Sequence, residues 1–355
     1  MAHDPKREDY LRLSLRFVHE LDAGDPAAAT RAFATFGRRF AQDRDSLPQS
    51  DADRAFYLMA LACEVVDYRL PFAAEAQADE LIARGKSLLD EALSLDPACF
   101  DALRMRSSTE CPTVEERYQF LVEREPEVHA ACEAARTQAL AGEGAESEDA
   151  VRTDRAALAA DLAMRPWLRW MASVAEEALI CGRNRACIDA CERLLAADPY
   201  DSCDVRFTLA YALAKLEDEE GLAELGRRYA TISPLRPDDD PWILLARTAL
   251  AHKRCDFATA RACLGQILAS YPNAGAALIR QMELPDGEFS RLHVAPYSED
   301  ELILAVSEGI VLFQEGVDRT GKGVFGAWVA KTVAELDPSA AAVVRAQETK
   351  GAEER

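Results

Sequence analysis

The sequence has 355 residues, of which 49% are hydrophobic and 29% are charged, a composition typical of a globular protein and not of a disordered chain. Its net charge of −21 argues against nucleic acid or an anionic membrane surface as a partner, since both require a basic face. Residues 51–150 carry 22 acidic and 9 basic side chains. Two interpretations fit this excess, a solvated acidic face and a surface that docks a basic partner.

Several features favour a cytoplasmic protein without a membrane anchor. No run of about 18 apolar residues occurs, so we expect no transmembrane helix. The first fifteen residues contain neither the apolar segment nor the small-residue cleavage site of a signal peptide. The ten cysteines are scattered through helical patterns, which suits a reducing compartment better than a disulfide framework does.

Helical periodicity continues along the chain, because apolar residues recur at i, i+3, i+4 and i+7 and strand alternation is almost absent. Residues 9–18 open the first predicted helix, which stops at Gly24, and Pro26 begins the next helix. Proline then recurs at intervals of 29 to 40 residues, at positions 97, 126, 166, 199, 234 and 272. Periods in the thirties predict stacked helix pairs whose second helix ends at a proline.

Two later helices have predictable starts. Asp240 is a suitable N-cap and Pro241 a suitable first residue, so the acidic run before Pro241 indicates a helix start better than a metal site. Ser298 and Glu301 have the spacing of a capping box and predict a helix over residues 299–314. Residues 326–336 provide the last long predicted helix.

The repeat pattern is clearest in residues 171–272. Small residues would let paired helices approach, while large ones fill the space between pairs. One unit supplies this pattern at Trp242, Leu245, Ala246, Ala249, Ala260, Leu264, Ile267 and Pro272. The unit before it supplies Met171, Val174, Ala175, Ala178, a turn at Gly182, then Cys187, Cys191, Leu194 and Pro199.

Residues 10–272 therefore resemble a tetratricopeptide-repeat protein. Three stretches are similar to the suppressor-of-tumorigenicity-7-type and related bacterial repeat proteins: RPWLRW at 165–170, GRN at 182–184 with LLAADPYD at 194–201, and APYSEDE at 295–301. The resemblance implies an all-α, right-handed superhelix of about six helix pairs with a C-terminal helical cap. It implies no catalytic activity and no assigned ligand.

This interpretation divides the chain into five segments. We expect N-terminal helix pairs in residues 1–138, an acidic loop or linker in 139–150, and a central array in 151–284. A helical cap would follow in 285–346, and the tail, 347–355, would be disordered.

Two sequences that suggest chemistry are better explained as structure. Residues 316–323, GVDRTGKG, lack the hydroxyl residue that a phosphate-binding P-loop needs after its lysine, and no strand is predicted before them. Four cysteines at 181, 187, 191 and 203 lack the paired C-x2-C spacing of zinc sites. We therefore predict a turn in the first case, core cysteines in the second, and neither a metal nor a cofactor.

In tetratricopeptide proteins ligands usually lie in a concave groove lined by the first helices. If the repeat register is right, that groove is lined by Arg169, Glu176, Phe207, Tyr211, Lys215 and Arg247. Aromatic and basic side chains together would suit an extended, somewhat acidic peptide. The alternative is that Phe207 and Tyr211 only pack against a neighbouring repeat. Trp167, Trp170 and Trp242 likewise fit either packing or partner binding.

The sequence thus predicts a non-enzymatic scaffold or adaptor that binds a protein or peptide segment. Two other functions remain open: a regulatory sensor with a small ligand in the groove, and an enzyme whose helical active site carries no familiar motif. No catalytic residue is predicted. The oligomeric state and the partner's identity are not predictable from these patterns.

Overall fold

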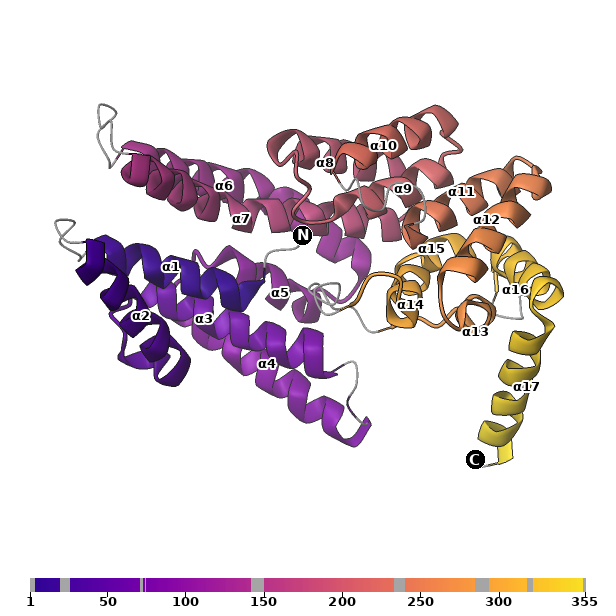
Figure 1. Ribbon diagram of the computed structural model, residues 1–355, viewed down its shortest axis with the longest axis horizontal. Helices are drawn as coiled ribbons and strands as arrows, with labels where there is room; N and C mark the ends of the chain where they lie inside the picture. Colours follow the sequence, from indigo (N-terminus) through magenta and orange to yellow (C-terminus); the bar gives the residue numbers. More distant parts are fainter. Residues whose placement is uncertain are drawn as a thin grey trace. The chain divides into compact units, whose positions relative to one another are not determined.

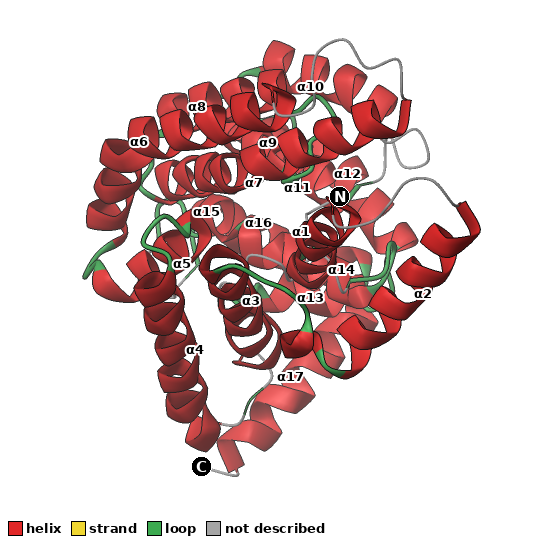
Figure 2. Cartoon of the chain, turned by 90° about the vertical axis from the view of Figure 1, so that its left-hand side faces the viewer, coloured by secondary structure: helices red, strands yellow, loops and turns green. Residues whose placement is uncertain are grey.

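The structure, a computed structural model, describes residues 4–19, 26–70, 73, 75–141, 150–232, 240–284, 294–317 and 322–353. Within these ranges the chain forms seventeen α-helices and no strand (Figures 1 and 2). The predicted all-α class is therefore confirmed. No helix in this described part is both long and apolar enough to cross a membrane.

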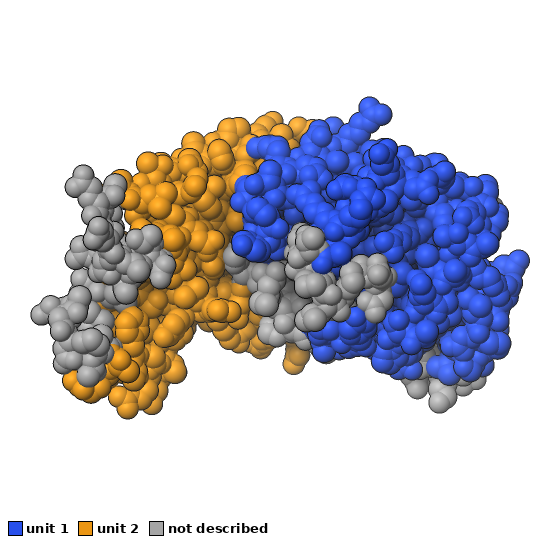
Figure 3. Space-filling model, turned by 45° about the horizontal axis from the view of Figure 1, so that its top comes forward, with its two compact units in different colours: residues 1, 174–355 blue, residues 2–173 orange. Residues whose placement is uncertain are grey.

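The chain divides into two compact units, residues 2–173 and 174–355, which we call the N-terminal and C-terminal units (orange and blue in Figure 3). The division lies inside a helix and not at the acidic segment 139–150. Of that segment, residues 142–149 fall outside the described residues, as does 285–293 at the start of the predicted cap.

The N-terminal unit contains six helices and most of a seventh, together with a short 3-10 helix and a π-helix. In chain order these are α1 Pro5–His19, α2 Pro26–Gln42, η1 Arg44–Ser46, α3 Asp51–Cys63, the π-helix η2 Glu64–Arg69, α4 Glu75–Leu95, α5 Phe100–Glu110, α6 Val114–Ala141 and α7 Ala150–Ile180. α3 and α4 pack closely as a pair, and α1 packs on α3. Buried Leu13, Phe36 and Leu47 form a core between α1, α2 and η1.

The C-terminal unit takes up the end of α7 and ten further helices. These are α8 Asn184–Ala197, α9 Val205–Lys215, α10 Glu219–Ile232, α11 Pro241–Lys253, α12 Phe257–Ser270, α13 Ala274–Arg280, α14 Glu299–Glu308, α15 Ile310–Phe313, α16 Val324–Leu336 and α17 Pro338–Glu353. α9 packs against both α8 and α11, and α11 pairs with α12. α11 is buried along almost its whole length because α14 and α16 also contact it.

Three helices of the repeat region end in the same way. Gly182, Glu217 and Cys255 each follow a helix in the left-handed conformation, with φ of 73°, 59° and 61°. In each case the next amide donates to a carbonyl five residues earlier: Arg183 to Ala178, Asp218 to Leu213, and Asp256 to Ala251. This is the Schellman motif, recurring after 35 and then 38 residues. The turns that join α7 to α8, α9 to α10 and α11 to α12 are therefore equivalent.

The predicted helix starts are largely confirmed. Asp240 accepts a hydrogen bond from the Trp242 amide at 3.1 Å, and Pro241 is the first residue of α11. The Ser298 hydroxyl accepts a hydrogen bond from the Glu301 amide at 3.1 Å. The Glu301 carboxylate, however, accepts from the amide of Tyr297 at 2.7 Å, so only half of the predicted capping box forms.

Other expectations need correction. Pro126 and Pro166 lie inside α6 and α7 and end neither helix. α17 continues to Glu353, so the tail expected to be disordered from residue 347 is helical up to there. In the glycine-rich segment 316–323, which lies partly outside the described residues, the Lys322 amine donates to the Ile279 carbonyl at 2.8 Å.

Replacing Ala260 with leucine should lower the free energy of unfolding by about 1–3 kcal/mol, because Ala260 lies fully buried in the α11–α12 pair and a larger side chain would overpack it. Thermal or denaturant unfolding measures the effect. Ala262→Leu, on the exposed face of the same helix, is the matched control and should change stability little. Equal effects of the two substitutions would contradict the assigned packing position.

Candidate functional site

The six side chains predicted to line a groove do not form one open site. Arg169 belongs to the N-terminal unit and the other five to the C-terminal unit. Phe207, Tyr211 and Lys215 do lie on successive turns of α9, as their spacing predicts. Phe207 and Tyr211 are buried, with 5% and 1% of their surfaces exposed, and Lys215 is half-buried. The expectation that these rings line an open groove is therefore corrected.

The chain's own C-terminal helices cover this face of α9. The Tyr211 hydroxyl donates to the Ala305 carbonyl of α14 at 2.8 Å. The Lys215 amine donates to the Val311 carbonyl of α15 at 3.0 Å. Both bonds end on main-chain carbonyls; the Ala305 carbonyl, which already accepts from the Gly309 amide at 2.9 Å, takes the Tyr211 hydroxyl as a second donor. The α9 face therefore holds a helical segment through its backbone.

Gly309, between α14 and α15, permits the close approach of Tyr211. A Cβ atom at this position would lie 3.1 Å from the Tyr211 hydroxyl and 3.0 Å from the Ala305 carbonyl oxygen. Both distances are shorter than ordinary carbon–oxygen contacts, so a larger residue would push the segment away from α9. The glycine is needed here for space, since its φ of −79° is open to any residue.

Trp242 connects the aromatic face of α9 to the same segment. Its ring stacks on Phe207 with centroids 4.1 Å apart and planes 15° from parallel. Its indole N–H donates to the Glu308 carboxylate at 2.6 Å. We name the surface formed by Phe207, Tyr211, Lys215 and Trp242 the α9 face, and α14–α15 its occupant.

The charges at the end of the α9 face are cationic and only partly compensated. Burial, together with the nearby Lys253 ammonium, lowers the pKa of Lys215, although the Glu315 carboxylate opposes that change. Lys253 forms an ion pair with Glu315 at 2.9 Å. A segment placed here is therefore favoured if it carries acidic groups. Residues 298–317, which include the occupant, contain five acidic residues and no basic one.

Arg247 and Glu176 lie elsewhere. Arg247 of α11 is half-buried, and its guanidinium would be 3.1 Å from a Cβ at Gly226. A side chain at position 226 would therefore require the Arg247 guanidinium to move slightly. Glu176 is exposed on α7.

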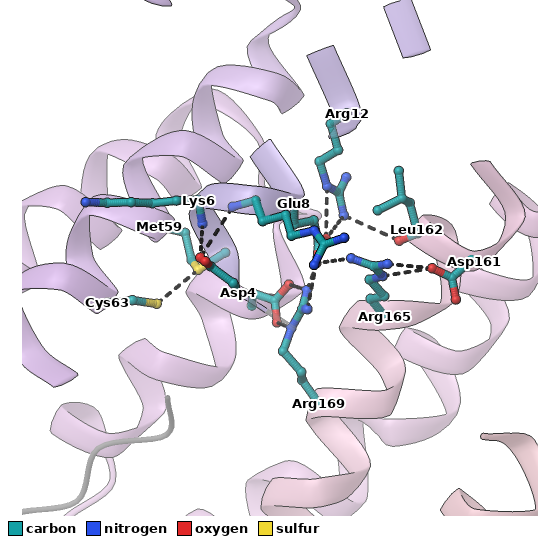
Figure 4. Close-up of polar contacts among 12 residues, drawn as sticks. Asp4, Lys6, Glu8, Arg12, Met59, Cys63, Asp161, Leu162, Arg165 and Arg169 are labelled. Carbon is teal, nitrogen blue, oxygen red and sulfur yellow. Dashed lines mark hydrogen bonds and ion pairs between the residues drawn. The ribbon is translucent and has the colours of Figure 1, made fainter. Parts of the chain in front are cut away.

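Arg169 lies at the centre of a buried ion network in the N-terminal unit. It donates to Glu8 of α1 at 2.9 Å and to Asp101 of α5 at 2.7 and 2.5 Å. Figure 4 shows Arg12 and Arg165 also directed at Glu8, with nitrogen–oxygen distances of 2.8 and 3.4 Å. The network thus ties three helices together through charge-assisted hydrogen bonds.

The arginines keep the buried carboxylates ionised. Burial alone would raise the pKa of Glu8, but Arg169 first, then Arg12 and Arg165, hold that pKa well below its ordinary value. The pKa of Asp101 is likewise lowered, because Arg169 and Arg104 outweigh the effect of burial. Carboxylates held in this way accept hydrogen bonds and are poor proton donors or general bases. The cluster therefore has a structural role. It was not predicted from the sequence, because its residues lie far apart in the chain.

Pro166 contributes to this network indirectly, because it leaves the main-chain carbonyl of Leu162 without its usual helical hydrogen bond. Proline has no amide hydrogen, so Leu162, four residues earlier, loses its intrahelical donor. The Arg12 guanidinium donates to the Leu162 carbonyl at 3.4 Å (Figure 4). A proline inside α7 is therefore accommodated because α1 supplies the missing hydrogen bond.

Trp167, Trp170 and Trp242 are buried, which favours packing, the first of the two roles considered for them from the sequence. Trp170 is fully buried and donates to the Leu121 carbonyl at 2.9 Å. Trp167, 4% exposed, donates to Glu125 at 2.9 Å. Trp242 is 3% exposed. Each indole N–H thus has a partner inside its own unit, which is the usual requirement for burying tryptophan.

Four cysteines, at 181, 187, 191 and 203, were predicted to lie in the core, and two of the four are buried. None forms a disulfide. Cys187 and Cys191 are buried one turn apart on α8, whereas Cys181 and Cys203 are half-buried. Among the residues that the structure describes, no three His, Cys, Asp or Glu side chains are placed to hold a metal ion.

Comparison with known protein families, with characterised proteins and with solved structures finds no match for this chain.

Proposed function

We propose that the chain is a non-enzymatic, tetratricopeptide-like scaffold, a right-handed superhelix that binds a protein segment on its first-helix face. The observation that supports this most is the pair of hydrogen bonds from Tyr211 and Lys215 to main-chain carbonyls of α14–α15. Side chains that hold a backbone accept many sequences, which is the requirement for an adaptor.

The occupant indicates what kind of segment fits. It is helical, whereas the sequence suggested an extended peptide, and it is acidic, as the cationic end of the α9 face favours. It also has a glycine where Tyr211 approaches. We propose that a partner provides a segment of this type and displaces α14–α15 when it binds.

The test uses the full chain and a labelled peptide of residues 298–317. In the wild type the built-in occupant competes with the peptide. Gly309→Val in the full chain should loosen the occupant and strengthen peptide binding at least about tenfold, since a population shift of that size needs little free energy. Fluorescence anisotropy measures the affinity, and circular dichroism checks that the variant is folded.

Two controls make the result specific. Gly265→Val on α12, where an added Cβ meets nothing within 4 Å, should leave peptide binding at the wild-type level. A peptide carrying Gly309→Val should not bind either chain. A folded Gly309→Val chain that fails to bind the wild-type peptide would refute the proposed binding face, and so would unfolding of the variant.

A further inference from the structure

Three sulfur atoms meet in the core of the N-terminal unit. The Cys63 sulfur lies 3.5 Å from that of Met59, one turn earlier on α3, and 3.5 Å from that of Met105 on α5. Figure 4 shows the Cys63–Met59 contact. Met59 and Cys63 are fully buried, and Met105 is 8% exposed. One thiol thus lies between two thioethers contributed by two helices.

The backbone is unusual at the same point. α3 ends at Cys63, and the six residues that follow, Glu64–Arg69, form a π-helix. π-Helical turns are rare and often occur at functional sites, since the wider turn changes where the neighbouring side chains are directed. The irregular backbone and the sulfur cluster are independent observations, and they meet at Cys63, which ends α3 and caps the π-helix.

We propose that Met59, Cys63 and Met105 form a binding site for the monovalent soft metal ion Cu(I). Thiolate and thioether ligands select this ion over harder metals. A trigonal ion with metal–sulfur bonds of about 2.3 Å separates its ligands by about 4.0 Å. The two contacts of the Cys63 sulfur therefore each have to lengthen by only about 0.5 Å, and the flexible, unbranched methionine side chains can bring the two thioethers to the third separation.

Charge selects the same ion. Cu(I) displaces the thiol proton of Cys63 to solvent and forms a bond with the thiolate sulfur, so one positive and one negative charge cancel in the core. A divalent ion such as zinc would leave a net positive charge, which is costly to bury without a partner. Met105, the only partly exposed ligand of the three, marks the side from which the ion enters.

The test titrates the full chain with Cu(I) under an anaerobic reductant, against a chromophoric Cu(I) chelator. The wild type should bind one ion per chain, with only sulfur ligands in the X-ray absorption spectrum. Met59→Leu and Met105→Leu preserve volume and folding, and each should weaken the affinity at least about tenfold, since a thioether ligand is lost. Cys63→Ser should abolish the site.

Two controls separate this site from other sulfur. Met171→Leu changes a fully buried methionine outside the cluster and should keep wild-type affinity. Cys187→Ala with Cys191→Ala removes the thiol pair on α8 and should also keep it. Equal affinity of the wild type and the two cluster methionine variants would overturn the proposal, as would loss of the copper in the Cys187/Cys191 variant.

Discussion

Replacing Arg169 with leucine is expected to lower the free energy of unfolding by about 3–5 kcal/mol, because it leaves the buried carboxylates of Glu8 and Asp101 without their main partner. The matched control is Arg136→Leu, which breaks an ion pair with Glu133 that is almost half exposed and should matter by less than about 1 kcal/mol. Denaturant unfolding of both variants measures the difference. Similar losses for the two would show that the buried network contributes little.

The loss should also depend on pH. The wild-type carboxylates have lowered pKa values, so their contribution is complete above the ordinary values of 4.5 for Glu8 and 3.8 for Asp101, and decreases as the pH falls through the lower folded values. Without Arg169, burial is offset less and these pKa values rise. At mildly acid pH, protonation of Glu8 and Asp101 then removes their buried negative charges and restores part of the variant's stability. The difference between wild type and variant is expected to shrink from pH 7 to about pH 4.

Trp170→Ala is expected to destabilise the chain by about 3–5 kcal/mol, since it removes a fully buried indole and leaves a cavity. It also removes the N–H donor to the Leu121 carbonyl. Trp170→Phe keeps an aromatic ring but loses that donor and a smaller part of the buried volume, so it should have a smaller effect, of about 1–3 kcal/mol. Thermal unfolding ranks the two. If Trp170→Ala stayed fully stable and lost a binding activity, partner binding would be its role instead.

Local signals in the sequence were sufficient to predict the all-helical class and several helix ends, but not the break at Gly309, which divides the helix expected over residues 299–314 into α14 and α15. The N-cap Asp240, the first-turn Pro241 and the left-handed Gly182 act through their own backbone and nearest neighbours. Glu217 and Cys255 form the same turn as Gly182 without being glycine. Their positions were not predictable from residue type, because residues other than glycine adopt the left-handed conformation only rarely.

Proline was misleading for a related reason. Pro166 looked like a helix end, and it would be one if the Leu162 carbonyl had no other donor. The donor is Arg12, 150 residues earlier in the chain. No local pattern contains that information. Glu8 was missed for the same reason, since a carboxylate on the first helix looks solvated until its arginines are placed around it.

The spacing of the α9 face was predictable, but its exposure was not. Phe207, Tyr211 and Lys215 share a face because they are four residues apart. Whether a face is open depends on what else packs on it, and the segment that covers this one comes some ninety residues later. A repeat pattern predicts contacts between neighbouring helices. It does not predict which distant segment of the same chain packs on them.

The network around Glu8 also constrains the order in which the N-terminal unit can fold. Its contacts join residues 161 and 150 positions apart, whereas α3 and α4 are neighbours in the chain. Closing a long loop loses more chain entropy, and contacts of high sequence separation form late. On the ribosome α1 is made before α7, so Glu8 has no contact with Arg165 or Arg169 until α7 has been synthesised. A nascent chain that ends before Arg169 can pair α3 with α4 but cannot close the unit.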